Sequence, residues 1–560
     1  MARLAEPTTL MPLPSPTGQV RRWALFSVVA GLLATLSLLV PFLIWRNAWF
    51  EWSNYYWLVL QQQNAVKAGF LPTYFIRTPS SGYLYPIFVF NGAPVFWMTA
   101  IIGVCVRSAW AAFILVLVTA STASYLGTWW IARNLGLSRL LAIAPAILIG
   151  MSTYVADDLY GRGDWAELVV VGFAPLLVAE LISLFKRPDR PTVRLASLLV
   201  TTAVMFGADN AATLCFGIAS LVVGVCMLPL LRYMRIPWST LLFVLSAMFV
   251  GMLLDSWYLV PSAWYAHDTL LYLYVPNEIA QGYSIVVDHL AYVLNPLRTF
   301  QTHTSLHPQL PSLVLLWSLI AGIYWWRRTE TRRLGIALCI GVGGLIVLLT
   351  NDVLWVHFPT AIRAVQFPWR MVPFDGLAIA LLMIVGLRAV GPRRIWKATA
   401  LIACGTVIGL SSYQAWSAPA LGWNGNPETV SADYAPYAFQ AAQQEGFHFQ
   451  TAHLMPEPSQ VVNVAPRSNG TYVAQVESGV TVADVASSPF VKVSNAKIIG
   501  EDGNGFVIVQ SLKSTTVSFR SSLPLPALVG IVLSLIALAM VPVVLVFGYR
   551  SHNSSIFSTN

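Results

Sequence analysis

Charged side chains are scarce in this sequence, and five of them gather in residues 154–167, YVADDLYGRGDWAE. Only 10% of the 560 residues are charged, and long apolar runs lie on both sides of this segment. Carboxylate oxygens suit a hard divalent cation such as Mg²⁺ or Mn²⁺, and a guanidinium suits a phosphate group. The segment therefore predicts a metal site at Asp157 and Asp158, or a site for a phosphate-bearing lipid headgroup at Asp157, Asp158, Arg162 and Glu167.

A second interpretation of residues 154–167 remains open. The same side chains would form a solvated turn if the aspartates cap the neighbouring helices and pair with Arg162. Spacing alone does not decide between the two interpretations. Asp164 is the poorest candidate ligand, because its position just before an apolar run predicts a helix cap.

Glu51 is the candidate catalytic base. It follows the first apolar run and has aromatic neighbours, among them Trp49, Phe50 and Trp52. Apolar surroundings raise the pKa of a carboxyl group, which tunes it for abstracting a proton near neutral pH. The alternative is a surface carboxylate beside an amphipathic helix at the membrane interface.

Two arginines in the stretch AIRAVQFPWRMVPFDG, Arg363 and Arg370, are candidates for binding an anionic headgroup. Pro368 and Pro373 predict an interrupted helix start, where backbone N–H groups without helical partners would also attract an anion. The alternative is that Arg370 extends to the interface beside Asp375.

Several kinds of chemistry find no support. The sequence has no Walker loop, dinucleotide fingerprint, GxSxG elbow or HExxH motif. Its five cysteines have neither CxxC nor metal-ligand spacing. The net charge of +9 comes largely from short basic clusters between apolar runs, which is typical of cytoplasmic loops and not of a nucleic-acid-binding surface. We therefore expect neither ATP-driven chemistry nor a nucleic-acid partner.

The elements that must position these residues are apolar helices. The chain is 56% hydrophobic, with a mean hydropathy of +0.65, and about 20 apolar residues suffice for a helix to cross a membrane. The apolar runs predict an all-α polytopic membrane protein with about twelve transmembrane helices. These spans are expected near residues 23–45, 108–132, 140–157, 165–185, 195–210, 212–231, 238–261, 310–326, 334–355, 371–390, 396–415 and 524–548.

Basic clusters set the expected orientation. They fall at alternate connections, which places the tails 1–22 and 549–560 in the cytoplasm of a plasma-membrane protein. Residues 85–106 are also apolar, but a crossing there would move every later basic cluster outside. We therefore assign them to a juxtamembrane helix in a first outer loop, 46–107, with a second large outer loop at 262–309.

Acidic residues are expected mainly on the outer side. Several lie at or within apolar segments, where an ionisable group usually faces a cavity or a partner: Asp209, Asp255, Asp352 and Asp375. Residues 416–523 change to alternating stretches such as TYVAQVESGVTV, which predict a small extracytoplasmic β-rich domain between the transmembrane domain 23–415 and the last helix, 524–548.

This order of elements resembles the GT-C superfamily of glycosyltransferases, which use polyprenyl-phosphate sugars. The shared order is a first span, a long aromatic outer loop with an early acid, a juxtamembrane helix, two spans and an acidic second outer loop. More narrowly, RGDWAE at residues 162–167 and QFPWR at 366–370 resemble bacterial membrane proteins labelled "6-pyruvoyl-tetrahydropterin synthase-related", which are akin to YfhO-type proteins. The resemblance covers most of the chain.

The resemblance implies a function for the candidate residues. Glu51 would be the catalytic base, and Asp157 and Asp158 would bind donor phosphate through a metal ion or contact the acceptor. The implied reaction transfers a sugar from a polyprenyl-phosphate carrier to an envelope polymer or lipid on the outer face, within a shell of membrane lipids. Two other classes stay open: a transporter or flippase of a lipid-linked substrate, and a non-catalytic scaffold for envelope assembly.

Overall fold

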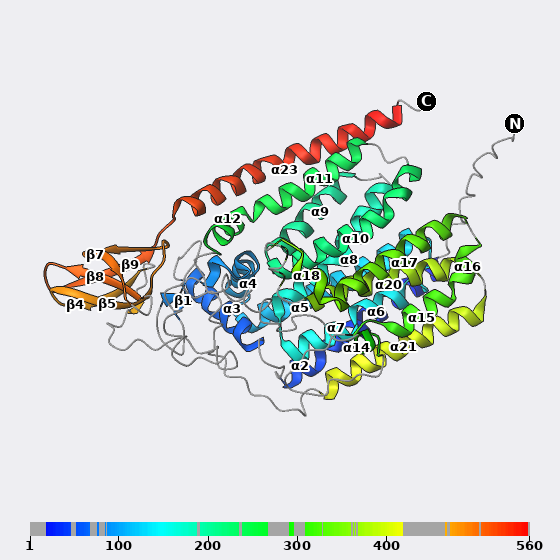
Figure 1. Ribbon diagram of the computed structural model, residues 1–560, viewed down its shortest axis with the longest axis horizontal. Helices are drawn as coiled ribbons and strands as arrows, with labels where there is room; N and C mark the ends of the chain where they lie inside the picture. Colours follow the sequence, from blue (N-terminus) through cyan, green and yellow to red (C-terminus); the bar gives the residue numbers. More distant parts are fainter. Residues whose placement is uncertain are drawn as a thin grey trace.

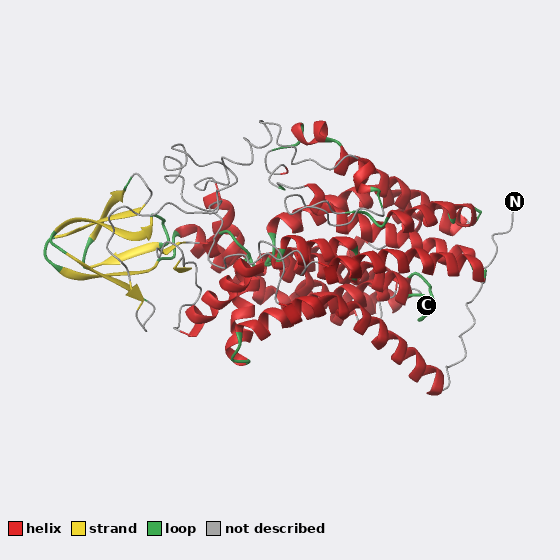
Figure 2. Cartoon of the chain, turned by 90° about the horizontal axis from the view of Figure 1, so that it is seen from below, coloured by secondary structure: helices red, strands yellow, loops and turns green. Residues whose placement is uncertain are grey.

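Most of the chain is a bundle of helices, with a small β domain at one end (Figure 1). The computed structural model describes the following residues: 18–45, 52–67, 76–77, 84–85, 87–186, 191–234, 238–266, 290–295, 309–327, 329–359, 362, 365, 368–391, 393–417, 465–466, 471–502 and 506–557. Strands and helices separate along the long axis of the molecule (Figure 2). The apolar runs thus form a helical bundle, as the sequence predicts.

Eight helices within these ranges are long and apolar enough to cross a membrane. The first combines three consecutive pieces, and the sixth begins with a 3₁₀ turn. They are α1 (Gly18–Leu36) with η1 (Ser37–Leu39) and α2 (Val40–Trp45), α5 (Ala109–Asn134), α8 (Trp165–Lys186), α10 (Asn210–Met234), α17 (Thr329–Thr350), η5 (Pro368–Met371) with α20 (Val372–Val390), α21 (Arg394–Ser417) and α23 (Leu525–Phe557).

The expected number of twelve spans is not confirmed. One expected span is a pair, α11 (Trp238–Leu254) and α12 (Ser256–Tyr265), bent by 70°, which counts as a ninth span if the pair crosses as one. The other three are broken or short because capping residues and turns interrupt them. They are α6 (Ile143–Gly150) with α7 (Thr153–Ala156), α9 (Pro191–Phe206), and α15 (Ser312–Ile320) with α16 (Gly322–Trp326).

Shorter helices complete the bundle. Residues 85–106, expected as a juxtamembrane helix, contain α4 (Ala93–Cys105), which has only 13 residues and is too short to span by itself. The remaining helical pieces are α3 (Trp52–Lys67), η2 (Ile87–Val89), η3 (Asp157–Arg162), α14 (Leu290–Val293) and α18 (Asp352–Val356).

Helix α20 forms the centre of the bundle. Of its 19 residues, 17 are buried, and its sequence is apolar on all sides, which is the pattern of a helix enclosed by others. Helices α6, α8, α10, α15, α16, α17 and α21 contact it. The helix therefore gives η5, which precedes it, a rigid support.

Helix α23 packs along α11 and α12 and closes the bend between them (Figure 1). A bend frees backbone groups from the helical ladder. Ser534 supplies partners, because its Oγ accepts a hydrogen bond from Trp257 N at 3.0 Å and donates one to Leu253 O at 3.2 Å. Gly530 lies so close to the carbonyl of Ser256 that a Cβ would collide with it. The last helix is thus fitted to the bend.

A small β domain precedes the last helix, as the alternating pattern predicts, and it contains two sheets. Their strand orders are β1-β2-β5-β8-β7 and β3-β4-β9-β6, and phenylalanine, valine and alanine side chains fill the core between them. The strands are β1 (Ile76–Arg77), β2 (Leu84–Tyr85), β3 (Ala465–Pro466), β4 (Tyr472–Val476), β5 (Gly479–Ala486), β6 (Val491–Ser494), β7 (Lys497–Glu501), β8 (Phe506–Ser511) and β9 (Thr515–Ser521).

Two of these strands come from the first loop and not from the predicted β segment. β2 pairs in parallel with β5, with Leu84 beside Val485. β1 then pairs with β2 in antiparallel fashion. The first loop and the β domain, about 400 residues apart along the chain, therefore share one sheet.

Candidate functional site

The segment that carries the predicted acids is a single wide helical turn. η3 (DDLYGR) is a π-helix, and Gly163 N donates a hydrogen bond to Asp158 O at 2.6 Å. Such turns occur frequently at functional sites, because the extra residue changes the direction of the following side chains. After this turn, Asp164 Oδ1 accepts a hydrogen bond from Glu167 N at 3.0 Å at the start of α8, so Asp164 is the helix cap that its position predicts.

Three ionisable side chains of residues 162–167 meet one from a distant part of the chain, and we call Arg162, Asp164, Glu167 and Arg370 the charged cluster. Glu167 Oε2 lies 2.6 Å from Arg162 Nη1 and 3.0 Å from Arg370 Nε. Asp164 Oδ2 lies 2.9 Å from Arg162 Nη2 and 3.9 Å from Arg370 Nη2. Each carboxylate therefore forms an ion pair with both guanidinium groups.

A tyrosine and a tryptophan contact the charged cluster. The hydroxyl of Tyr154 donates a hydrogen bond to Glu167 Oε1, so both oxygens of that carboxylate are engaged. The guanidinium carbon of Arg162 lies 5.1 Å from the centroid of the Trp369 ring, and that of Arg370 lies 6.0 Å from it. These separations permit cation–π attraction, which adds to the ion pairs.

The charged cluster is deeply buried. Asp164 and Glu167 are fully buried, and Arg162 and Arg370 expose 7% and 5% of their surfaces. Removing these charges from water is costly, and it is offset here by short, charge-assisted contacts. Any anionic ligand would compete with Glu167 and Asp164 for the arginines. The arrangement is therefore a preorganised pair of cations held in fixed positions by two acids.

Asp157 and Asp158, the predicted metal ligands, lie in η3 and are 4% and 2% exposed. These two side chains are therefore buried and not solvated. Within the described part of the chain, no group of three or more His, Cys, Asp or Glu side chains is arranged to hold a metal ion. The two aspartates alone do not fit a divalent cation, which prefers six or more oxygen ligands, and the metal site stays a prediction.

Glu51 and Arg363 lie outside the described residues. Trp52, the residue after Glu51, begins α3, and its ring centroid is 5.5 Å from that of Phe42. The ring contacts continue from Phe42 to Phe113 at 6.4 Å, and from Phe113 to Trp165 at 5.1 Å. An aromatic chain thus connects the start of α3 to the residue that follows Asp164.

Asp209 belongs to the same region, although the sequence marks it only as an acid beside an apolar run. Its Oδ1 accepts a hydrogen bond from Ala212 N at 2.6 Å and caps α10. Burial raises the pKa of this carboxyl above its ordinary value, while the nearby Arg370 guanidinium acts in the opposite direction. Asp209 is therefore an electrostatic neighbour of the charged cluster.

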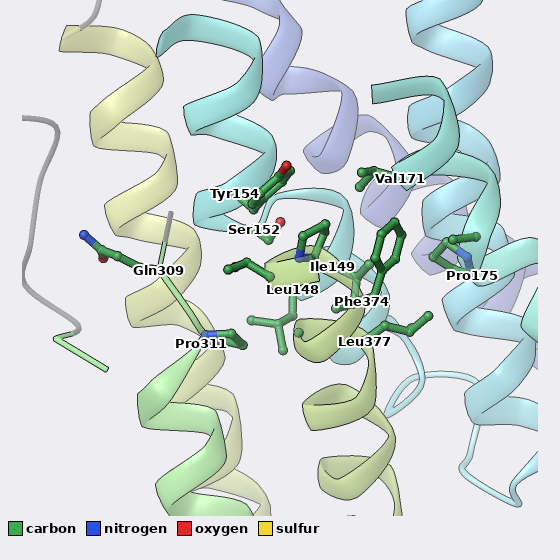
Figure 3. Close-up of a pocket in the computed structure, with 14 residues that line it drawn as sticks. Leu148, Ile149, Ser152, Tyr154, Val171, Pro175, Gln309, Pro311, Phe374 and Leu377 are labelled. Carbon is green, nitrogen blue, oxygen red and sulfur yellow. The ribbon is translucent and has the colours of Figure 1, made fainter. Parts of the chain in front are cut away.

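An apolar pocket lies next to Tyr154, the residue whose hydroxyl contacts the charged cluster (Figure 3). Tyr154 and Ser152 lie on one side of it, and Phe374 and Leu377 of α20 lie on another. Tyr154 therefore borders the pocket with its ring and contacts the charged cluster with its hydroxyl. Gln309, at the end of the large outer loop 262–309, and Pro311 just after it also line the pocket.

Comparisons with known proteins give weak similarities. The oligosaccharyltransferase of Archaeoglobus fulgidus in its apo form has a TM-score of 0.46 and 12% identity over 79% of this chain and 61% of its own. The arabinofuranosyltransferase AftD from Mycobacteria has a TM-score of 0.42 and 18% identity over 76% of this chain and 28% of its own. The chain thus spans less than two thirds of either structure.

Comparisons of the sequence find no matches. No protein-family model matches the chain, and neither does any curated protein. The resemblances to the GT-C superfamily and to YfhO-type proteins therefore stay predictions. The described residues establish a bundle with eight helices apolar enough to cross a membrane, a small β domain, and a buried charged cluster at the start of two of those helices.

Proposed function

We propose that this protein is a multi-pass glycosyltransferase of the plasma membrane with cytoplasmic termini. In this proposal it transfers a sugar from a polyprenyl-phosphate carrier to an envelope polymer or lipid on the outer face. The observation that carries the proposal is the fixed pair Arg162 and Arg370, which is connected through Glu167 and Tyr154 to an apolar pocket. A phosphate attached to a long hydrocarbon needs these two environments next to each other.

The reaction assigns a role to each group. The acceptor hydroxyl attacks the anomeric carbon with inversion, and the bond from that carbon to the phosphate oxygen breaks. The electron pair of that bond stays on the phosphate, where Arg162 and Arg370 stabilise the developing charge. Glu51 accepts the proton of the acceptor hydroxyl. Glu167 and Asp164 do not react; they hold the arginines in place.

The aromatic chain from Trp52 to Trp165 supports a role for Glu51, because it fixes the start of α3 relative to the charged cluster. Asp157 and Asp158, together with Arg363, remain proposed substrate contacts. No step is assigned to a metal ion, since the described side chains do not form a complete ligand set.

The test is sugar transfer in membranes that contain the purified chain and a radiolabelled polyprenyl-phosphate sugar, with an envelope extract as acceptor. Glu51→Gln should abolish transfer, and Arg370→Lys should lower kcat by about 10²-fold, because a lysine cannot reproduce the fork of donors. Glu477→Gln, which changes an exposed acid of the β domain, is the matched control and should leave transfer unchanged.

Two outcomes would overturn parts of the proposal. Full activity of the Glu51→Gln variant would remove Glu51 as the base. Failure of the unmodified protein to transfer sugar from any polyprenyl-phosphate donor would overturn the enzymatic function and favour a non-catalytic scaffold.

A further inference from the structure

The hydroxyl of Tyr258 is a saturated junction between three segments. It accepts hydrogen bonds from Gly92 N at 3.0 Å and from Asn210 Nδ2 at 2.9 Å, and it donates one to Phe90 O at 3.0 Å. A phenol offers one donor and two acceptor positions, and all three are used. Tyr258 is 1% exposed, so water cannot replace any of these partners.

The segment that Tyr258 holds is packed tightly against the turn between α9 and α10. Gly92 has φ +40°, in the left-handed region, and a Cβ there would collide with Ala208 O. Val95 N donates a hydrogen bond to Gly207 O at 3.1 Å. The start of α4 and the start of α10 therefore have a fixed relative position.

This position matters because Asn210 directly follows Asp209. Asp209 caps α10, and α10 contacts η5, the segment that carries Arg370. The charge of Asp209 also interacts with those of Arg370 and Glu167. One peptide bond thus separates a hydrogen-bonding partner of Tyr258 from an electrostatic neighbour of the charged cluster. Displacement of Asn210 would also move the Asp209 carboxylate relative to Arg370.

Helix α12, which carries Tyr258, also contacts the β domain. The ring centroid of Tyr265, at the end of this helix, is 5.4 Å from that of Phe490. Trp257, next to Tyr258, packs against the core of the β domain. The first loop contacts the same domain where β2 joins β5.

From these contacts we infer that Tyr258 is a positioning residue that links the β domain and the first loop to the charged cluster through Asn210 and Asp209. Its hydroxyl holds residues 90–92 against the start of α10 and so fixes the direction from which Asp209 acts on Arg370. The inference has a structural part, that Tyr258 fixes residues 90–92 against the start of α10, and a catalytic part, that this position affects sugar transfer. The catalytic part rests on the proposed function. The structural part does not.

The structural part is tested by hydrogen exchange on the full-length protein in detergent. Tyr258→Phe should speed exchange of the amides in residues 87–96 and 207–213 by at least about tenfold, since Gly92 N, Phe90 O and Asn210 Nδ2 lose their shared partner. Tyr125→Phe is the matched control: it also removes a buried tyrosine hydroxyl, which donates to Val28 O at 3.0 Å between α5 and α1. The control should leave both peptides unchanged, and an equal response of the two variants would overturn the inference.

The catalytic part is tested by a double-mutant cycle with the sugar-transfer assay. Tyr258→Phe and Asp209→Asn should each lower kcat several-fold with little change in KM, and the double variant should be no slower than the slower single one. Tyr125→Phe combined with Asp209→Asn should show only the effect of Asp209→Asn. If the effects of Tyr258→Phe and Asp209→Asn multiply, Tyr258 does not act through Asp209.

The two assays separate the possible failures. If the unmodified protein transfers no sugar, the proposed function fails, while hydrogen exchange still decides whether Tyr258 fixes the two segments. If transfer occurs but exchange is unchanged in Tyr258→Phe, the inference fails and the proposed function stands.

Discussion

Glu167 and Asp375 are both completely buried carboxylic acids in the first turn of a long apolar helix. Glu167 binds two arginines and a tyrosine hydroxyl, whereas neither carboxyl oxygen of Asp375 has a hydrogen-bond partner within the described structure. A buried ionised group is costly unless it is paired. The comparison teaches that a buried acid in an apolar run indicates a functional site only when it has charged partners. Burial alone does not distinguish the paired Glu167 from Asp375.

The largest difference between the two acids should appear when each loses its charge without changing shape. Glu167→Gln leaves Arg162 and Arg370 buried with less counter-charge, so the free energy of unfolding should fall by about 3–5 kcal/mol. Thermal and denaturant unfolding of the purified protein in detergent measure this loss. A change below about 1 kcal/mol would mean that Asp164 alone suffices to hold both arginines.

Asp375→Asn is the matching substitution at the partnerless acid. It removes no hydrogen bond or ion pair within the described structure, so the free energy of unfolding should change by less than about 1 kcal/mol and sugar transfer should persist. The same unfolding assay, run beside Glu167→Gln, gives the comparison directly. A loss as large as that of Glu167→Gln would show that Asp375 has a charged partner among residues outside the described ranges.

The smallest effect is expected at Asp209, whose carboxylate caps α10. Burial raises its pKa above the ordinary value of 3.8, so the folded protein binds this proton more tightly than the unfolded chain does. The stability contributed by this group therefore falls as the pH rises above that value. Asp209→Asn, whose amide oxygen can still cap α10, removes this dependence.

Unfolding from pH 4 to pH 8 measures the effect. The unmodified protein should lose stability relative to the Asp209→Asn variant as the pH increases. The opposite trend would mean that the attraction of Arg370 outweighs burial at this carboxyl.

Local chemistry made part of the site predictable. Asp164 was placed as a cap because a cap depends on residues three positions apart, and Arg162 lies near its acids because all three are close in sequence. Arg370 was identified as a candidate from its proline-flanked position, but its contact with Glu167 spans 203 residues, and no local pattern carries such a pairing. Glu51 and Arg363 are not described in the structure, so their roles stay predictions.

The fold was also predictable where it depends on local sequence and not where it depends on distant contacts. The apolar runs predicted the helical bundle, and the alternating residues before the last helix predicted strands. Hydropathy did not reveal the break at Asp255, because a bend leaves composition unchanged and depends on how Ser534 and Gly530 of α23 meet the bent backbone. The pairing of Leu84 with Val485 was equally inaccessible, since a two-residue strand has no readable period.

The contact of Ser534 with the bend also has a consequence for biosynthesis. Its partners Trp257 and Leu253 precede it by 277 and 281 residues. Until α23 has been translated, Trp257 N and Leu253 O at the bend lack these hydrogen-bond partners. The contacts of α23 with α11 and α12 can therefore form only after translation has passed the β domain, so the docking of α23 is a late step in folding.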